Sequence, residues 1–338
     1  MSRMDITVGA VDLSSDADLN AINALAAAYD DEFLGGHDDL TADESRAALR
    51  VNEYRRMLVI AAQHPAHGLV GVSYVRLGLR SDTDKALFWT HVGRQHRGQG
   101  IGSKLAEHVA AHVRELGRPQ LRMSALVPAE VCADDPALPS TRIATKLGMV
   151  GCGVDVARAA PLPLPGALLE PMRASLTPAR GYTLISWRDR TPEEHLDELV
   201  DLINQLTADA PHEDKQIDPD VWTPDRLRDS EQRTIETGFD THVVAAVDAN
   251  GRLAGYTELS VKASPATTIA WQGDTVVARQ HRGHGLGLTM KLVSHTALGD
   301  SAVTSVATWN SQANPWMIAI NEALGYRVRA LQPVYRSA

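Results

Sequence analysis

The chain has 338 residues, 44% of them hydrophobic and 22% charged, and it carries a net charge of −9. This length exceeds what one hydrophobic core usually serves, so two domains are expected. No apolar run approaches the roughly 18 residues needed to cross a bilayer. An acidic chain without clustered Lys and Arg is also unsuited to general nucleic-acid binding. Neither membrane nor nucleic acid is therefore an expected partner.

The N-terminal residues and the cysteines exclude further classes of protein. The stretch MSRMDITVGAVDLSS lacks the basic and apolar regions of a secretory signal, so a cytoplasmic location is expected. Cys132 and Cys152 are too few for a disulfide framework and form no CxxC pattern. His108 and His112 are four residues apart on a predicted helix, but no third ligand is near them in sequence, so no metal site is expected.

In chain order, the first predicted elements are a helix and two strands. Two N-cap candidates, Ser14 and Ser15, precede apolar residues at helical spacing. These apolar residues are Leu19, Ile22, Leu25 and Tyr29. Strand-like runs follow at Leu69–Leu77 and Ala86–Val92. The first part of the chain is therefore predicted to combine a helix with a sheet.

A glycine-rich turn follows the second strand, and it occurs twice. Arg94–Gly102 (RQHRGQGIG) and Arg279–Gly287 (RQHRGHGLG) are 185 residues apart. Each copy lies between a strand-like run and a helix-like run, the strand of the second copy being Ile269–Val277. Further parallels, Leu69–Leu77 with Leu253–Val261 and KLGM at 146–149 with ALGY at 323–326, extend the repeat over whole domains.

The two copies are joined by a proline-rich stretch. Residues 159–178 contain prolines at 161, 163, 165, 171 and 178, a composition that resists helix and predicts a linker or an extended crossing. The boundary is therefore placed near 165–180. The predicted domains are residues 1–165 and 180–338.

The second copy opens with a clearer helix signal and then a hairpin. Thr191-Pro192-Glu193-Glu194 has the sequence of a capping box with proline at the first helical position. One apolar face follows, made of Leu196, Leu199, Val200, Ile203 and Leu206. Alternating runs at 242–247 and 253–259 flank the turn Ala249-Asn250-Gly251. Each half is thus predicted to be α+β, with a mostly antiparallel sheet.

The glycine turns have the features of an anion site. Glycines at 98, 100 and 102, and again at 283, 285 and 287, lie where a strand hands over to a helix, so bare backbone amides can face a phosphate. The G-x-G-x-G spacing is neither the dinucleotide fingerprint nor the ATP phosphate loop. A tight structural turn would explain one copy, but two copies that both retain Arg and His favour a ligand.

These turns resemble the pyrophosphate loop [QR]-x-x-G-x-[GA] of the GNAT superfamily of N-acetyltransferases, at Arg97–Gly102 and Arg282–Gly287. The resemblance covers nearly the whole chain as two domains. It implies in each a mixed, mostly antiparallel central sheet flanked by helices, with strands 4 and 5 splayed around acetyl-CoA. The residues that it places at the CoA are Val276, Val277, Ala278, Arg282, Gly283, His284, Gly285, Leu286, Gly287, Asn310 and Asn314, and in the first half His91, Val92, Gly93, Arg97, Gly98, Gln99, Gly100, Ile101 and Gly102.

The chain departs from the family where the family's Tyr general acid stands. The family has an Asn at the start of a helix, a Tyr seven residues later and then L-G-F/Y. Here Asn314 and Leu324-Gly325-Tyr326 match this frame, but Asn321 occupies the Tyr position. Because of this position, Asn321 is counted among the candidate catalytic residues. In the first half Ala144 and Ala137 stand at the Tyr and Asn positions, so that copy departs further.

Acetyl transfer to an amine needs a base, and two carboxylates are candidates. Asp274 and Glu258 lie in strand-like segments of the second half, where an ionisable residue requires an explanation. Their counterparts in the first half, about Trp89 and Tyr74, cannot act as bases. The structural alternatives are an aspartate in a turn beside Gly273 and a solvent-facing Glu258. By resemblance, a backbone amide near Val277 would donate to the oxyanion.

The acceptor is inferred from acidic and aromatic residues. The segment that covers the acceptor in this superfamily is acidic in both halves, which favours a small cationic amine such as an aminoglycoside or polyamine. The acidic residues are Asp30, Asp31, Glu32, Asp38, Asp39, Asp43 and Glu44, then Asp209, Glu213, Asp214, Asp218 and Asp220. Trp271 and Trp309 flank the expected CoA region and would suit a pocket wall.

Three functions remain open from the sequence. The first is a tandem N-acetyltransferase, monomeric or homodimeric, with its catalytic site in the second half and a degenerate first half. The second is an acyl-CoA-binding regulatory or scaffold protein without turnover, because neither half has the Tyr acid. The third is an acetyltransferase similar to mycothiol synthase, which is also a tandem GNAT protein.

Overall fold

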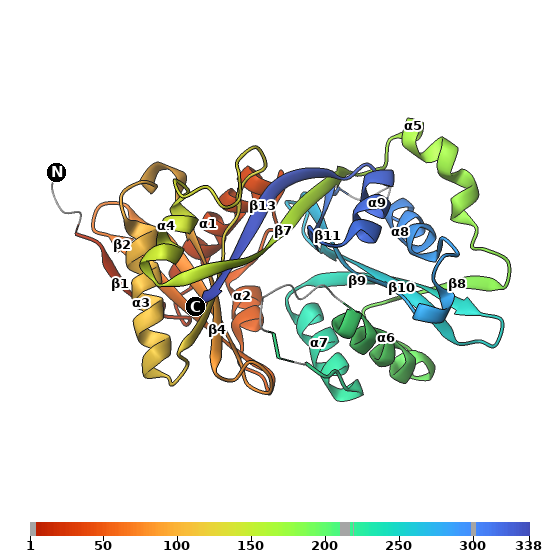
Figure 1. Ribbon diagram of the computed structural model, residues 1–338, viewed down its shortest axis with the longest axis horizontal. Coiled ribbons are helices and arrows are strands. Elements are labelled where there is room, and N and C mark those ends of the chain that lie inside the picture. Colours follow the sequence, from red (N-terminus) through yellow and green to blue (C-terminus); the bar gives the residue numbers. More distant parts are fainter. Residues whose placement is uncertain (1–4, 210–216, 219, 299–301) are drawn as a thin grey trace.

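The computed structural model describes residues 5–209, 217, 218, 220–298 and 302–338 (Figure 1). The elements of the first half are β1 (Thr7–Ala10), α1 (Asp16–Leu34), α2 (Ala42–Leu49), β2 (Arg55–His64), β3 (Gly68–Gly78), β4 (Lys85–Val92), the 3-10 helix η1 (Arg94–His96), α3 (Ile101–Glu115), β5 (Gln120–Ser124), β6 (Val127–Pro128), α4 (Pro139–Lys146) and β7 (Met149–Pro161).

A short helical stretch, α5 (Gly166–Leu169) and η2 (Glu170–Leu176), leads into the second half. The elements there are β8 (Tyr182–Arg188), η3 (Glu193–His195), α6 (Leu196–Asp209), α7 (Pro224–Glu236), β9 (Phe239–Asp248), β10 (Leu253–Lys262), β11 (Ile269–Val277), η4 (Arg279–His281), α8 (Leu286–Thr296), β12 (Ser305–Ser311), α9 (Pro315–Ala323) and β13 (Arg327–Ser337).

The first helix follows the predicted pattern. Ser15 caps α1 by accepting a hydrogen bond from the Asp18 amide at 3.2 Å, and Gly35 ends the helix with φ of +78°. Leu19 and Ile22 are buried against the sheet. The hairpin of β9 and β10 also forms where it is predicted.

Two local predictions are wrong. The capping box at Thr191 does not form, because the Thr191 amide, from which Glu194 would have to accept, donates to Glu231 Oε1 of α7 instead. The helix instead enters through the 3-10 turn η3, and its predicted apolar face packs into the core as expected.

The expectation that the proline-rich stretch resists helix is the second correction, since residues 166–176 are helical; the alternative that it is a linker is not contradicted. Pro171 stands in the first turn of η2, where a missing N–H costs nothing. Apolar side chains of this stretch, among them Leu168 and Met172, pack on the core of the second half and so hold it in place.

The strands form one continuous sheet that joins the halves by exchange of their last strands. The order is β1-β2-β3-β4-β5-β13-β7-β12-β11-β10-β9-β8, with β6 paired to β13. The C-terminal strand β13 lies between β5 and β7, while β7 of the first half pairs with β12 of the second. Both strands run across the middle of the molecule (Figure 1). The division into domains 1–165 and 180–338 stays a prediction. The strands β7 and β13 each pair with strands of the other half.

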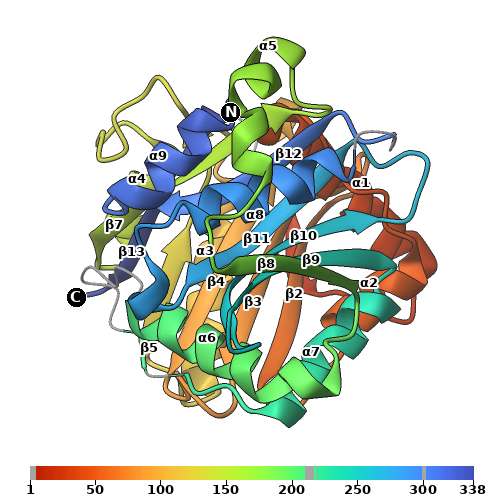
Figure 2. The same ribbon diagram turned by 90° about the vertical axis from the view of Figure 1, so that its right-hand side faces the viewer.

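The cores reflect this exchange. Tyr335 of β13 belongs to the core that α3 forms with the first-half strands. Leu162 and Leu164, which follow β7, belong to the core around α8 and β12. Seen along the long axis, strands β8–β11 stand in front of β2–β5 (Figure 2). Among the described residues, no helix is long and apolar enough to cross a membrane.

Candidate active site

In each half, the two central parallel strands separate at the place that the resemblance predicts. In the second half the parallel ladder of β11 and β12 ends at Trp271 and Ala307, although β11 continues to Val277. In the first half the ladder of β4 and β5 ends at Trp89 and Ser124, three residues before β4 ends. The α+β fold with splayed fourth and fifth strands is therefore present in both halves.

Each glycine turn presents an open helix N-terminus at the end of the splayed strand. Four glycines of the two turns have φ between +73° and +82°: Gly98, Gly100, Gly283 and Gly285. A Cβ on any of them would meet no atom within 4 Å. This left-handed backbone favours glycine. Within the described part of the chain, no side chain caps α3 or α8, so their first-turn amides are available to an anion.

The loop arginines have the same role in both halves. Arg97 Nε donates to the Val92 carbonyl at 3.0 Å, and Arg282 Nε donates to the Val277 carbonyl at 3.1 Å. Their guanidinium groups pair with Glu32 of α1 and with Asp209 of α6, respectively. The arginines thus tie the turn to the first helix of their half, which keeps the turn in one geometry.

A bulge distinguishes the second half from the first. The hydroxyl pair Ser73–Thr90 in the first half recurs as Thr257–Thr275 in the second, each with oxygens 2.7 Å apart. Beyond this pair, β10 and β11 slip by one residue between Thr257 and Leu259, whereas β3 and β4 stay in register. The second half thus has one extra residue, which explains why the repeat offset is 184 before it and 185 after it.

The bulge places two carboxylates together. Gly273 and Asp274 stand opposite Glu258, whose Oε1 accepts from the Asp274 amide at 3.4 Å. A Cβ on Gly273 would lie 2.5 Å from Glu258 Oε1, so glycine is needed for this approach. The Tyr256 hydroxyl donates to Asp274 Oδ2 at 3.2 Å. The structure therefore brings together the two residues proposed as the base.

Burial favours a shared proton on this pair. Desolvation, with the nearby Asp274 charge, raises the pKa of Glu258 to about 8. Desolvation also raises the pKa of Asp274, against the Tyr256 hydrogen bond. Both side chains remain only half-buried by surface area, so a ligand can reach them. A desolvated but accessible carboxyl pair has the properties of a general base near neutral pH.

The corresponding place in the first half is filled by rings. Trp89 and Tyr74 stand at the positions of Asp274 and Glu258 and stack with centroids 5.5 Å apart. His91 stacks on Tyr29 of α1 at 3.9 Å, and burial lowers the pKa of His91 to about 4. These rings provide no base and occupy the space beside β4.

Asn321, at the position of the family's Tyr, belongs to a buried polar network. Its Oδ1 accepts from Lys291 Nζ of α8 at 2.5 Å, and its Nδ2 donates to Asn310 Oδ1 at 2.5 Å. Burial lowers the pKa of Lys291 to about 7. Asn314 instead caps α9 by accepting from the Met317 amide. Asn310 and Asn321 are thus brought together, while Asn314 has a helix-capping role.

Lys291 is a site residue that the sequence reasoning missed. A signal was present, because Lys291 follows Gly287 by one helical turn and stands between Met290 and Leu292. The helix α8 is buried on nearly every side, so the side chain of a lysine in its middle has no route to solvent.

The aromatic pair and the acidic segments meet across the two halves. Trp271 and Trp309 stack at 5.4 Å, and Trp271 Nε1 donates to Asp38 of the first half at 2.6 Å. Most carboxylates of the acidic segments have partners; the pairs are Asp31–His37, Glu32–Arg97, Asp43–Arg46, Glu44–Lys262, Asp209–Arg279, Asp218–Lys85 and Asp220–Arg226. Glu213 and Asp214 lie outside the described residues.

Comparisons with known proteins agree with this geometry. No family model and no curated protein matches the sequence. Among solved structures, a tandem GNAT protein from the clavulanic acid biosynthesis pathway is 22% identical, with 98% of each chain covered and a TM-score of 0.76. A GCN5-related N-acetyltransferase from Sphaerobacter thermophilus is 18% identical over 98% of this chain and 95% of that one, at 0.64. The Saccharomyces cerevisiae N-myristoyltransferase is 10% identical over 98% and 78%, at 0.58. The chain has the tandem GNAT fold.

Proposed function

We propose that this chain, which has the tandem GNAT fold, is an acyl-CoA-dependent N-acyltransferase whose second half acetylates the primary amine of a small cationic molecule. An aminoglycoside, a polyamine or a related metabolite is the acceptor class. The observation that carries the proposal is the accessible carboxyl pair Asp274–Glu258 beside the unpaired part of β11.

Coenzyme A fits the residues of the second half. The uncapped amides of α8 suit its pyrophosphate, with Arg282–Gly287 forming the turn. Val276 and Val277 on β11 and Asn310 on β12 lie on the parted strands, with Ala278 directly after β11, where its pantetheine arm would pair. Among the described residues, no donor reaches the buried Gln272 Oε1 at the point where β11 and β12 part, so this acceptor suits an amide N–H.

The carboxyl pair supports proton removal from the acceptor. An amine enters as an ammonium ion at neutral pH, and a pair that shares one proton retains one negative charge to attract it. The pair then takes the ammonium proton, which frees the nitrogen lone pair. Acetyl-CoA would supply the activated acyl group: the amine nitrogen bonds to the acyl carbon, the C–S bond breaks, and the second proton lost by the nitrogen goes to the departing thiolate, which leaves as the thiol. A backbone amide near Val277 is the donor for the charge on the acyl oxygen.

Asn321 has a positioning role and does not act as a general acid. An amide cannot release a proton near neutral pH, so Asn321 cannot replace a tyrosine as an acid. Its bonds to Lys291 and Asn310 hold the C-terminal end of α9 against α8 and β12. Lys291 is the titratable group in contact with it.

The first half serves a different role in this proposal. It retains the anion-binding turn but has rings in place of the carboxylates, so it holds CoA or supports the second half without turnover. The alternatives, an acyl-CoA-binding regulatory protein and an activity similar to mycothiol synthase, differ in turnover and in acceptor.

One experiment separates these functions. Thiol release from acetyl-CoA is measured against polyamines, aminoglycosides and the amine precursor of mycothiol. The variants are Gly285→Asp and Gly100→Asp, with Gly285→Asn and Gly100→Asn as matched controls, because Asn and Asp both tolerate positive φ and only Asp adds a charge. Loss of turnover only in Gly285→Asp supports catalysis by the second half. CoA binding without turnover of any amine refutes the proposal and favours the regulatory protein.

A further inference from the structure

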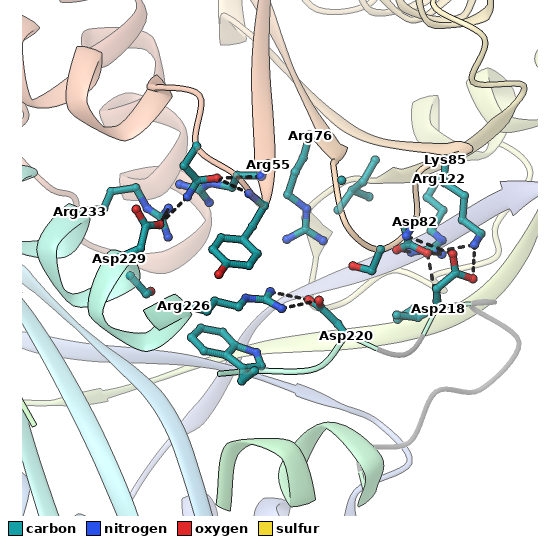
Figure 3. Close-up of a pocket in the computed structure, with 18 residues that line it drawn as sticks. Arg55, Arg76, Asp82, Lys85, Arg122, Asp218, Asp220, Arg226, Asp229 and Arg233 are labelled. Atoms are coloured by element: carbon teal, nitrogen blue, oxygen red, sulfur yellow. Dashed lines mark hydrogen bonds and ion pairs between the residues drawn. The ribbon is translucent and has the colours of Figure 1, made fainter. Parts of the chain in front are cut away.

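A separate cavity of about 340 Å³ lies between the two halves (Figure 3). The first half contributes Tyr54 and Arg55 at the start of β2, Arg76 near the end of β3, Lys85 of β4 and Arg122 of β5. The second half contributes residues 217, 218, 220 and 222, and the α7 side chains Arg226, Asp229, Ser230 and Arg233. Its volume suits a small metabolite. None of the residues proposed to bind CoA or to act on the acyl group lines it, although Asp218 and Asp220 of the second acidic segment do.

Every carboxylate of this cavity already has a cationic partner. Asp82 accepts hydrogen bonds from Nη1 and Nη2 of Arg122, each at 2.9 Å, and Lys85 Nζ lies 3.0 Å from Asp82 and 2.5 Å from Asp218. At the other end, Asp220 pairs with Arg226, and Asp229 accepts from Arg233 at 3.4 Å and from Asn52 at 2.7 Å. None of the described lining carboxylates is therefore left over for a further cation.

Two arginines remain in excess. Among the described residues, the lining has six cationic and four anionic side chains, an excess of two positive charges. Arg55 has a buried Nε without a partner among the described residues, whereas its Nη2 donates to the Ala48 carbonyl at 3.3 Å. Arg76 makes no hydrogen bond or ion pair with any described residue. It stands in the middle of the cavity, between the two paired groups (Figure 3).

The environment of these arginines is desolvated but open to a ligand. Burial, with the like charges of Arg233 and Arg76, lowers the pKa of Arg55 to about 10. Burial also lowers the pKa of Arg76, although its side chain is exposed by surface area. Both observations fit guanidinium groups that face a water-accessible space enclosed by protein. Holding two unpaired cations there is unfavourable until an anion enters.

One wall of the cavity is rigid. Arg226 lies over the Tyr54 ring at 4.9 Å and over the Trp222 ring at 4.5 Å. The same guanidinium pairs with Asp220, so its position is fixed from three directions. A ligand would therefore meet preformed walls from both halves, and little ordering would accompany binding.

We propose that this cavity is a binding site for a small molecule with two oxyanion groups, held by Arg55 and Arg76. Planar guanidinium groups bind carboxylate and phosphate in two-point geometry, and the excess of two charges matches a dianion. A bound ligand would bridge β2 and β3 of the first half to α7 of the second. Its site is distinct from the glycine turns.

Calorimetric titration with pyrophosphate and with succinate tests this proposal. The titrations use the full chain with Gly100→Asp and Gly285→Asp, so that the glycine turns do not bind the probes. Arg55→Gln and Arg76→Gln are then added one at a time. Arg56→Gln is the matched control, because Arg56 neighbours Arg55 on β2 but is exposed and does not line the cavity.

We expect saturable binding of at least one probe at one site per chain. Arg55→Gln and Arg76→Gln should each weaken it at least tenfold, and Arg56→Gln less than twofold. Tighter pyrophosphate would assign a phosphorylated ligand, and tighter succinate a dicarboxylate. Without ligand, Arg76→Gln should raise the melting temperature because it removes an unpaired charge. No saturable binding, equal binding by all variants, or a lowered melting temperature of ligand-free Arg76→Gln would each overturn the proposal.

Discussion

Replacing Glu258 with Gln tests the central claim that a desolvated carboxyl pair serves as the base. Since burial raises the pKa of Glu258 to about 8 from 4.5, the folded protein retains this proton over a pH range in which the unfolded chain releases it. The unfolded state therefore binds fewer protons between pH 4.5 and 8, and stability falls as the pH rises through this window. Glu258→Gln has no such proton to lose.

The size of this change in stability follows from the difference between the two pKa values of Glu258, 4.5 in the unfolded chain and about 8 in the folded protein. At about 1.4 kcal/mol for each tenfold change in proton affinity, the full interval is worth roughly 4–5 kcal/mol. Because the side chain retains contact with solvent, we expect about half of this, or roughly 2 kcal/mol. Glu258→Gln should thus match the wild type near pH 4 and exceed its stability by that amount at pH 9. Its turnover should fall by roughly 100-fold or more, as for loss of a general base.

The assay is urea unfolding from pH 4 to pH 9, together with kcat/KM over the same range. The exposed Glu194, as Glu194→Gln, is the control and should give a difference that does not vary with pH. The wild-type kcat/KM should rise with pH to a plateau, with an apparent pKa that belongs to the pair. If Glu258→Gln is less stable than the wild type at pH 9, or if it retains turnover, Glu258 is an ordinary carboxylate and the assignment fails.

Further predictions concern the glycine turn, the bulge, the buried lysine and the exchanged strand. Gly285→Asp should bind CoA at least tenfold more weakly than Gly285→Asn in calorimetry, since only the carboxylate repels pyrophosphate; equal binding would place CoA elsewhere. Gly273→Ala should lower kcat roughly tenfold, because its Cβ displaces Glu258, and unchanged kinetics would contradict this. Burial lowers the pKa of Lys291 to about 7, so Lys291→Met should exceed the wild type in unfolding free energy most below pH 7 and progressively less towards pH 10.5. A difference that does not vary with pH would argue against a buried ammonium. A chain ending at Tyr326 should lose cooperative melting in both halves, because it lacks β13, whereas a stable first half would show that β13 is dispensable there.

The amino-acid sequence determined the features that depend on neighbouring residues. The glycine turns, their strand and helix flanks and the duplication follow from short spacings, because backbone conformation and amphipathic period are local properties. The change of offset from 184 to 185 was also present in the sequence, but its meaning as a bulge required the pairing of β10 with β11.

Only the tertiary structure decided which distant segments meet. The exchange pairs residues of β7 and β12 that are 144–156 positions apart and residues of β5 and β13 that are 210–214 positions apart, and nothing in any of these strands' own patterns specifies its partner. The bond between Lys291 and Asn321 and the grouping of Arg55 with Arg76 likewise arise from packing between elements. Charge and burial at such places depend on three-dimensional neighbours, so the properties of a buried carboxyl, lysine or arginine become visible only once the chain is folded.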